Sequence, residues 1–127
     1  MNNWIMPCNI NYFDIIKRFE ESDYVVWRRG AKIEEGDEIY IYVGVPFSKI
    51  LYKCVVEDSD VNSTVVDQNS YARIGGFEKN KRYMQLKLVH VYKEGISLEK
   101  LKQIGLFGVR RQTQLDTKVV DYIKTQE

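Results

Sequence analysis

Residues 37–58 constrain the fold most, because they hold the strongest strand signal in the chain. Two runs rich in Ile, Val and Tyr, Glu38–Val43 and Ile50–Glu57, flank the connection Gly44-Val45-Pro46-Phe47. Such runs suit a pleated sheet, and a short Gly/Pro connection between them predicts an antiparallel hairpin. Alternate residues of a strand face opposite sides, and neither side of this hairpin is plainly polar. We therefore expect a central hairpin that is covered on both faces.

Size and charge bound the class of protein. A chain of 127 residues fits a single domain, 1–127, with a sizeable core. Apolar residues make up 44% and charged residues 29%, an ordinary globular mixture. The net charge of +1 excludes a global basic field, so any contact with nucleic acid has to come from a local patch.

The two cysteines do not have the spacing of a metal site. Cys8 and Cys54 lie 46 positions apart, and no CxxC spacing occurs. We expect two buried, free thiols, no metal and no cofactor. No basic leader follows Met1, and no apolar run approaches the ~20 residues that span a bilayer. The expected location is the cytoplasm, without membrane contact.

Periodicity predicts further strands and helices on either side of the hairpin. Strands are expected at Asn3–Cys8, Tyr24–Trp27 and Tyr83–Tyr92, the last closed by Glu94-Gly95. Helices are expected at Tyr12–Glu21 with Asn9 or Asn11 as its cap, from Ser97 to Gly105, and after Asp116 or Thr117. This order predicts an α/β (α+β) fold with a small, curved, mostly antiparallel sheet or open barrel and flanking helices.

The segment Ser59–Arg82 is long and polar, which is uncommon inside a compact domain. Val61–Asp67 is compatible with a continued strand, and Ser70–Ile74 with one helical turn. Its part from Tyr71 to Tyr83 is basic. We expect the segment to flank a binding pocket or the path of a nucleic acid.

Catalytic motifs are missing from the sequence. His90 is the only histidine, on the apolar face of an expected strand, and no GxSxG, HExxH, P-loop or GxGxxG pattern occurs. The paired acids Glu34-Glu35, Asp37-Glu38 and Glu57-Asp58 lie at expected turns, where solvated or capping roles are usual. We expect no catalytic residue and no enzyme activity.

Aromatic and basic residues are more informative than the acids. Trp27 directly precedes Arg28-Arg29-Gly30, so a ring lies beside two guanidinium groups where a strand ends. This combination suits stacking on a base and binding of phosphates. Arg110 and Arg111 lie in a later loop and are candidates for the same phosphate contacts. Trp4, inside the first strand, is expected in the core.

The order of these residues resembles that of EVE domains. Trp4-Ile5-Met6-Pro7-Cys8-Asn9 resembles the family's first tryptophan strand, although EVE proteins usually have a charged Lys-Ser-Glu-type segment after this tryptophan. Trp27-Arg28 resembles the second tryptophan, and Ile33–Ile39 its Gly-Asp approach to a central strand. Tyr40–Gly44 is similar to the strand whose end lines the pocket, and Tyr83–Leu88 and Arg110–Leu115 follow in the expected order.

The resemblance implies the PUA-like superfold, shared with YTH and ASCH domains, and a pocket for a modified base. Trp27 would stack on that base. Asn9 and backbone groups near Cys8 and Val43–Gly44 would read the edge of the base, beside Tyr42. The phosphates would be held by Arg28, Arg29, Arg110 and Arg111.

The function expected first is therefore a non-catalytic module that binds a modified base in nucleic acid, in DNA rather than RNA. The EVE-like branch that the chain resembles most occurs in bacteria alone or fused to HNH nucleases, which implies modification-dependent restriction with a separate nuclease. An RNA-binding module of ASCH or PUA type is one alternative. The other is a nucleoside or amide hydrolase, which would need Lys53, Glu57 or His90 in the pocket as general acid or base.

Overall fold

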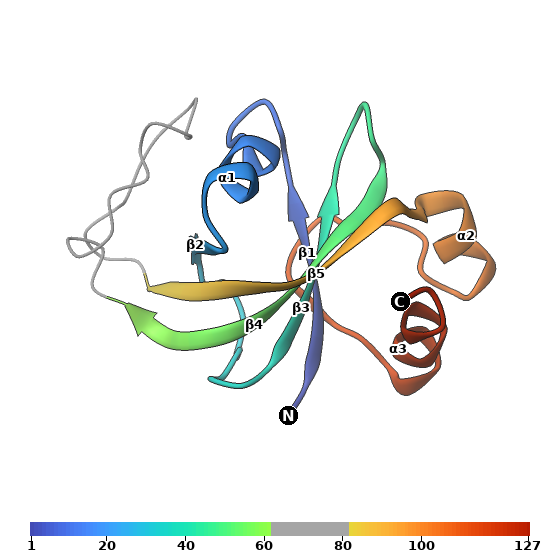
Figure 1. Ribbon diagram of the computed structural model, residues 1–127. Coiled ribbons are helices and arrows are strands. Elements are labelled where there is room, and N and C mark those ends of the chain that lie inside the picture. The colour runs from blue at the N-terminus through green and yellow to red at the C-terminus, as the bar shows by residue number, and fades with distance from the viewer. Residues whose placement is uncertain (62–81) are drawn as a thin grey trace.

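In residues 1–61 and 82–127, which the structure describes, three helices flank one six-stranded sheet (Figure 1). The structure is a computed structural model. The elements are β1 (Asn3–Cys8), α1 (Ile15–Glu21), β2 (Tyr24–Arg28), β3 (Glu38–Val43), β4 (Lys49–Val61), β5 (Tyr83–Ser97), α2 (Leu98–Gln103), β6 (Thr113–Gln114) and α3 (Thr117–Lys124). The strand order is β2-β5-β4-β3-β1-β6, and β1–β3 is the one parallel pair in this part of the chain. The predicted α+β class with a mostly antiparallel sheet is confirmed.

The predicted hairpin is the centre of the sheet. β3 and β4 pair antiparallel, with Glu38 opposite Val55 and Val43 opposite Lys49. β1 lies parallel to β3 on its other side, with Cys8 opposite Val43. All six residues of β3 are buried, as expected for a strand with neighbours on both edges and packed material on both faces.

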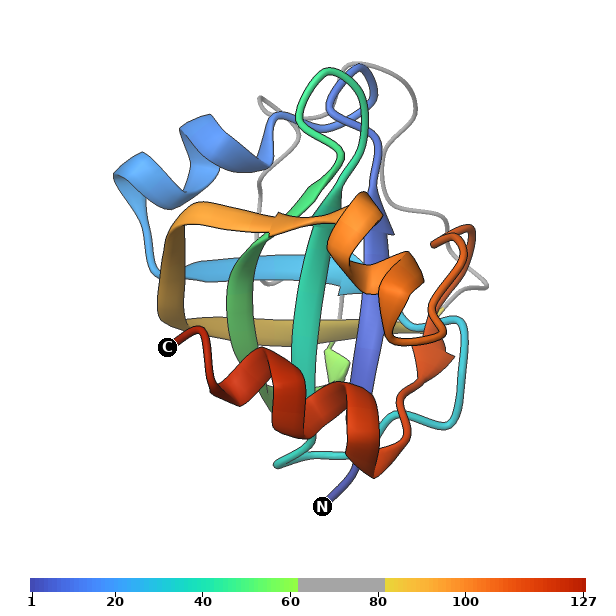
Figure 2. The ribbon, with the colours of Figure 1, turned by 90° about the vertical axis from the view of Figure 1, so that its right-hand side faces the viewer.

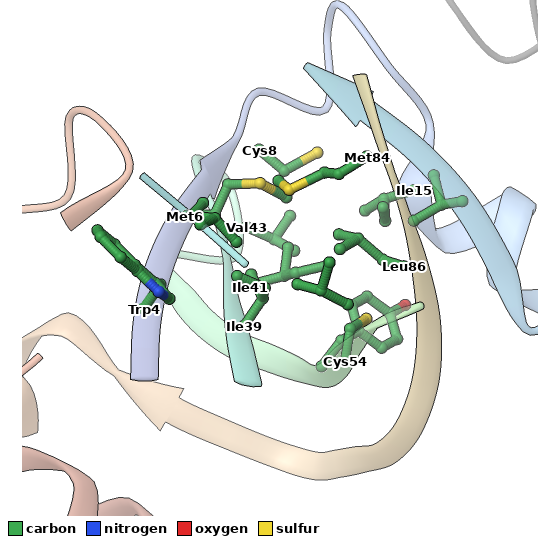
Figure 3. Packing of buried hydrophobic residues seen from close by; sticks show 14 residues of the cluster. Trp4, Met6, Cys8, Ile15, Ile39, Ile41, Val43, Cys54, Met84 and Leu86 are labelled. Atoms are coloured by element: carbon green, nitrogen blue, oxygen red, sulfur yellow. The ribbon is translucent and has the colours of Figure 1, made fainter. Parts of the chain in front are cut away.

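Apolar side chains cover both faces of this central strand, as the alternation predicted. Ile39, Ile41 and Val43 belong to a first core cluster, which Figure 3 shows converging with Met6 and Met84. Tyr40 and Tyr42 of β3 belong to a second cluster with residues of α2 and α3. Figure 2 shows these two helices lying in front of the sheet. Both cysteines are free and buried in the first cluster.

The strand β5 runs further than the sequence predicted. It continues past Glu94-Gly95 to Ser97, so the expected strand end was wrong. Gly95 lies inside the strand with φ +72°, and a Cβ there would come within 2.7 Å of Lys49 Cδ. The register between β4 and β5 shifts next to this position. A glycine here allows the strand to bend and leaves room for the Lys49 side chain, so β5 continues past Gly95. Figure 2 shows β5 turning sharply, so that its first part and β2 run across β1 and β3.

Side-chain caps define the helix ends. Asp14, and neither Asn9 nor Asn11, caps α1: its Oδ1 accepts from Lys17 N at 3.1 Å, and the helix begins at Ile15 instead of Tyr12. Asn9 Oδ1 accepts from Asn11 N in the preceding turn, so the predicted cap was wrong because the chain makes an additional turn first. The other caps are as predicted: Ser97 for α2, with Gly105 at φ +98° after it, and Asp116 for α3.

Two acids that the sequence placed at the surface, Asp37 and Glu38, are buried. Asp37 is 1% exposed and accepts three hydrogen bonds, from Trp4 Nε1 (2.9 Å), Asn2 N (2.9 Å) and Glu34 N (3.0 Å). Burial alone would raise its pKa, but these hydrogen bonds outweigh burial and lower the pKa of Asp37. The expectation of a solvated turn acid was therefore wrong for Asp37. The core position predicted for Trp4 is confirmed, since its ring is 7% exposed.

Most of the predicted Ser59–Arg82 segment lies outside the described residues. Its first residues, up to Val61, continue β4. The predicted helical turn at Ser70–Ile74 and the basic part as far as residue 81 belong to residues 62–81, which the structure does not describe. No helix in the described ranges is both long enough and apolar enough to cross a bilayer.

Candidate nucleic-acid interface

A hollow lies where the two edges of the curled sheet approach each other. The strand order leaves β2 at one edge and β6, beside β1, at the other. Between them is a cavity of about 410 Å³, here called the seam pocket, which is lined by Met6 and Pro7 of β1, Trp27 and Arg28 of β2, Gly30, and Arg110, Arg111 and Gln112. Four of the predicted site residues, Trp27, Arg28, Arg110 and Arg111, thus come together from segments far apart in the sequence.

A second hollow adjoins the first. This tip pocket has a volume of about 320 Å³ and is lined by Pro7, Cys8, Asn9, Asn11, Tyr42, Gly44, Val45 and Val109. It lies at the carboxyl ends of the parallel strands β1 and β3, next to the β3–β4 hairpin loop. Pro7 lines both hollows, and Val109 of the tip pocket directly precedes Arg110 of the seam pocket. Four further predicted residues, Cys8, Asn9, Tyr42 and Gly44, line this second hollow.

Trp27 forms a half-buried wall of the seam pocket. Its backbone pairs with Met84 of β5, which fixes the strand, and its ring meets Phe13 edge to face at 5.1 Å and 82°. A ring held by an aromatic edge contact and still facing a cavity can offer surface to a flat ligand. The three arginines of the same pocket are exposed, so their charges are available at its mouth.

Arg29 is placed differently from its neighbour Arg28. Its Nε donates to Ala31 O at 3.2 Å and its Nη1 to Ser59 O at 3.3 Å, while its backbone N donates to Arg82 O. It is not among the residues that line either hollow. Adjacent residues at a strand end point to opposite sides. The guanidinium of Arg29 therefore fixes the turn after β2 on the side away from the seam pocket.

The backbone groups predicted to read a base edge are largely used within the protein. Gly44 N donates to Cys8 O at 3.0 Å, which joins the ends of β1 and β3. Val43 is 0% exposed and packs in the first core cluster, so its side chain offers no surface to a ligand. The Cys8 thiol lies within 3.7 Å of Phe13 O, and burial, together with the nearby Asp14 charge, raises its pKa to about 12. Asn9 is the exposed polar side chain of the predicted set at this hollow, and Tyr42 of the same set is buried.

Gln112 was not predicted as a site residue. Its Nε2 donates to Arg28 O and its Oε1 accepts from Gly30 N, both at 2.7 Å. Met6, Pro7 and Val109 were also not assigned to the pocket. The one sequence signal for Gln112 was its position next to Arg110-Arg111, because partners more than eighty residues away leave no local pattern.

The three candidate acid–base residues do not line the two hollows. Lys53 forms ion pairs with Glu38 (2.8 Å) and Glu127 (2.9 Å). Burial opposes its charge, but these partners outweigh burial and raise the pKa of Lys53, so it stays protonated at neutral pH. His90 packs edge to face on Tyr92 at 4.6 Å in another hollow. Glu57 is exposed on β4.

In the described ranges, no group of three or more His, Cys, Asp or Glu side chains is arranged to hold a metal ion. The polar side chains at the two hollows include the amides of Asn9, Asn11 and Gln112, the Tyr42 hydroxyl and three arginine guanidiniums, which bind by hydrogen bonding and charge. The arrangement as a whole offers an aromatic wall, three cations and an exposed amide around two adjoining hollows.

No protein-family model matches the chain, and no curated protein matches it. Solved structures do. The ASCH protein from Zymomonas mobilis is 17% identical with a TM-score of 0.67, over 98% of this chain and 94% of that chain. Human THYN1, an EVE domain protein solved in complex with DNA that contains 5-methylcytosine, is 12% identical with a TM-score of 0.69, over 100% and 98%. A hypothetical protein from Leishmania major is 16% identical with a TM-score of 0.70, over 98% and 93%.

At these identities the likeness shows the fold. The chain has the PUA-like fold of ASCH and EVE domains, with an open, mixed six-stranded sheet. The resemblance noted in the sequence therefore predicted the architecture correctly.

Proposed function

We propose that this chain is a non-enzymatic module that binds a modified base in nucleic acid, with DNA preferred to RNA. The observation on which the proposal depends most is the composition of the seam pocket, where Trp27 meets Arg28, Arg110 and Arg111 in one hollow. A ring beside several guanidiniums suits a base with its flanking phosphates. The volume of about 410 Å³ lies within the roughly 300–1,000 Å³ usual for ligand sites.

In this proposal the base leaves the helical stack and lies against Trp27. Extrusion of a base costs a few kcal/mol, and stacking on an aromatic side chain returns about 1–3 kcal/mol per base. The remainder would come from the arginines on the phosphates and from polar contacts to the base, for which Asn9 in the adjoining tip pocket is the exposed candidate. Arg29 is left out of the phosphate contacts, because its guanidinium binds backbone carbonyls.

The likeness to THYN1, solved with 5-methylcytosine DNA, supports a first choice of probe. Fluorescence anisotropy would compare labelled duplexes of one sequence with and without a single 5-methylcytosine, together with the matching RNA, at fixed salt. Tighter binding of the modified duplex is the expected result. Equal binding of all DNA and RNA probes would refute base recognition, and a preference for RNA would favour the RNA-binding alternative.

The wider role is modification-dependent restriction in the cytoplasm, with cleavage supplied by a separate nuclease. The three candidate acid–base residues, Lys53, Glu57 and His90, lie outside the two hollows. This placement supports a division in which this chain recognises the base and another protein cleaves the nucleic acid. Incubation of the protein with methylated DNA, RNA, nucleosides and simple amides should leave all of them intact. Hydrolysis that disappears in a Lys53→Met, Glu57→Gln or His90→Gln variant would overturn the proposal in favour of a hydrolase.

A further inference from the structure

The two edges that border the seam pocket are joined by one side chain. Among the described residues β2 pairs with β5 alone and β6 with β1, so the strand order places β2 and β6 at opposite ends of the sheet. Gln112, the residue before β6, reaches across the gap to the end of β2. Its side-chain amide donates to Arg28 O and accepts from Gly30 N, each at 2.7 Å.

This contact has a defined chemistry. A carbonyl oxygen can only accept and a backbone N–H can only donate, so the two partners fix which end of the Gln112 amide is oxygen. The amide thus pairs with the edge of β2 much as a neighbouring strand would. Gly30 permits the approach, because a Cβ there would already lie 3.3 Å from Gln112 Oε1.

We infer that Gln112 is a positioning residue that sets the distance between the Trp27–Arg28 wall and the Arg110–Arg111 wall of the seam pocket. Trp27 and Arg28 lie next to the backbone groups that Gln112 binds, and Arg110 and Arg111 directly precede Gln112 in the chain. A shift of the Gln112 amide therefore moves the Trp27 ring relative to the cations of Arg110 and Arg111. The inference rests on the proposed function, because it assigns Gln112 a part in base recognition.

The turn after β2 has a separate anchor on its other side. Arg29 binds Ala31 O and Ser59 O through its side chain and Arg82 O through its backbone. Removal of the Gln112 amide therefore leaves this turn attached to β4 and β5. We expect a Gln112 variant to fold, with a melting temperature lowered by less than about 8 °C.

The test uses Gln112→Met, which keeps the length of the side chain and removes both hydrogen bonds. Gln114→Met is the matched control, since Gln114 is an exposed glutamine of β6 two residues further on. The first measurement needs no ligand: amide hydrogen exchange at Gly30, whose N–H is bonded to Gln112 Oε1. Exchange at Gly30 should speed up in Gln112→Met and stay unchanged in the control. Equal exchange at Gly30 in all three proteins would overturn the contact itself.

The second measurement is the ratio of dissociation constants for unmodified duplex and for duplex with one 5-methylcytosine. Gln112→Met should lower this ratio about 3- to 30-fold, less than the roughly 5- to 150-fold loss expected when a stacking ring is removed. The slope of the logarithm of the binding constant against the logarithm of the salt concentration should stay within about 0.5 of the wild-type slope, because the arginines are still present. A purely structural role would lower the melting temperature and leave the ratio unchanged, which would overturn the inference.

The two proposals can fail separately. If wild type binds both duplexes equally, the proposed function fails, and the positioning role is then judged on affinity for the unmodified duplex. In that case, a dissociation constant for the unmodified duplex that is the same in Gln112→Met and wild type overturns the positioning role. Failure of wild type to bind either duplex also overturns the positioning role. If wild type discriminates and Gln112→Met discriminates equally well, only the positioning role is lost.

Discussion

The two tryptophans should separate stability from recognition. Trp27 is half-buried in the seam pocket, whereas Trp4 is 7% exposed and donates its indole N–H to the buried carboxylate of Asp37. We compare Trp27→Ala, which removes the proposed stacking surface, with Trp4→Phe, which keeps a core ring and removes the donor. The assay is anisotropy with two duplexes that differ by one 5-methylcytosine, at one salt concentration, beside thermal melting of each variant.

The magnitudes follow from the contacts of each ring. A stacked base contributes about 1–3 kcal/mol, so Trp27→Ala should weaken binding of the modified duplex roughly 5- to 150-fold. Binding of the unmodified duplex, supplied by the exposed arginines, should change little. Trp27→Ala also loses the edge contact to Phe13, about 0.5–1.5 kcal/mol, and the packing of the half-buried ring against the first core cluster, so its melting temperature should fall as well.

The expected result for Trp4→Phe is the reverse. A hydrogen bond to a charged group contributes about 1.5–3 kcal/mol, a large part of the roughly 5–15 kcal/mol that holds a domain folded. The melting temperature should fall, and the ratio of the two dissociation constants should remain that of wild type. If Trp4→Phe stays fully folded but no longer distinguishes the two duplexes, while Trp27→Ala still does, then Trp4 is the stacking ring and Trp27 the structural one. If neither variant alters the ratio, stacking in the seam pocket is refuted.

Three further outcomes are expected. The double variant Arg110→Ala plus Arg111→Ala should flatten the salt dependence of the observed binding constant by about 1.8 in slope, from roughly 0.9 per charge, while Lys118→Ala on α3 leaves it unchanged. Arg29→Ala should lower the melting temperature and leave that slope unaltered, because its guanidinium holds backbone carbonyls. The folded-state pKa of Asp37 lies below its ordinary value, so its stabilisation is present above about pH 4 and is lost as pH falls through the folded pKa. Denaturant melts between pH 2 and 7 should therefore show less loss on acidification for Asp37→Asn than for wild type.

The sequence predicted the parts of the fold that depend on local periodicity. The alternation of Ile, Val and Tyr in Glu38–Val43 specified a strand buried on both faces, and Ser97 and Asp116 marked helix starts by their own side-chain chemistry. The strand end expected at Gly95 was wrong, because a glycine in a bent strand and a glycine in a turn have the same local signature.

The candidate site was predictable only in its residue types. A tryptophan followed by arginines indicated where stacking and charge would meet, but alternation at the end of β2 places Arg28 and Arg29 on opposite sides. The role of Asp37 depends on a ring 33 positions earlier, and that of Gln112 on backbone more than eighty positions earlier. Such contacts follow from the path of the sheet, which short-range patterns do not contain.

The pairing of β1 has a consequence for the order in which the protein folds. The β3–β4 hairpin closes a short loop, whereas Trp4 of β1 pairs with Gln114 of β6, more than a hundred residues along the chain. The entropy of loop closure makes such distant pairs late and easily reopened, and β6 has only two residues, both exposed. The proposed nucleic-acid site, which needs the segment leading into β6, would then be the last part to assemble and the first to open. Native-state hydrogen exchange should accordingly show lower opening free energies at Thr113 and Leu115 than in β3, and equal values would refute this order.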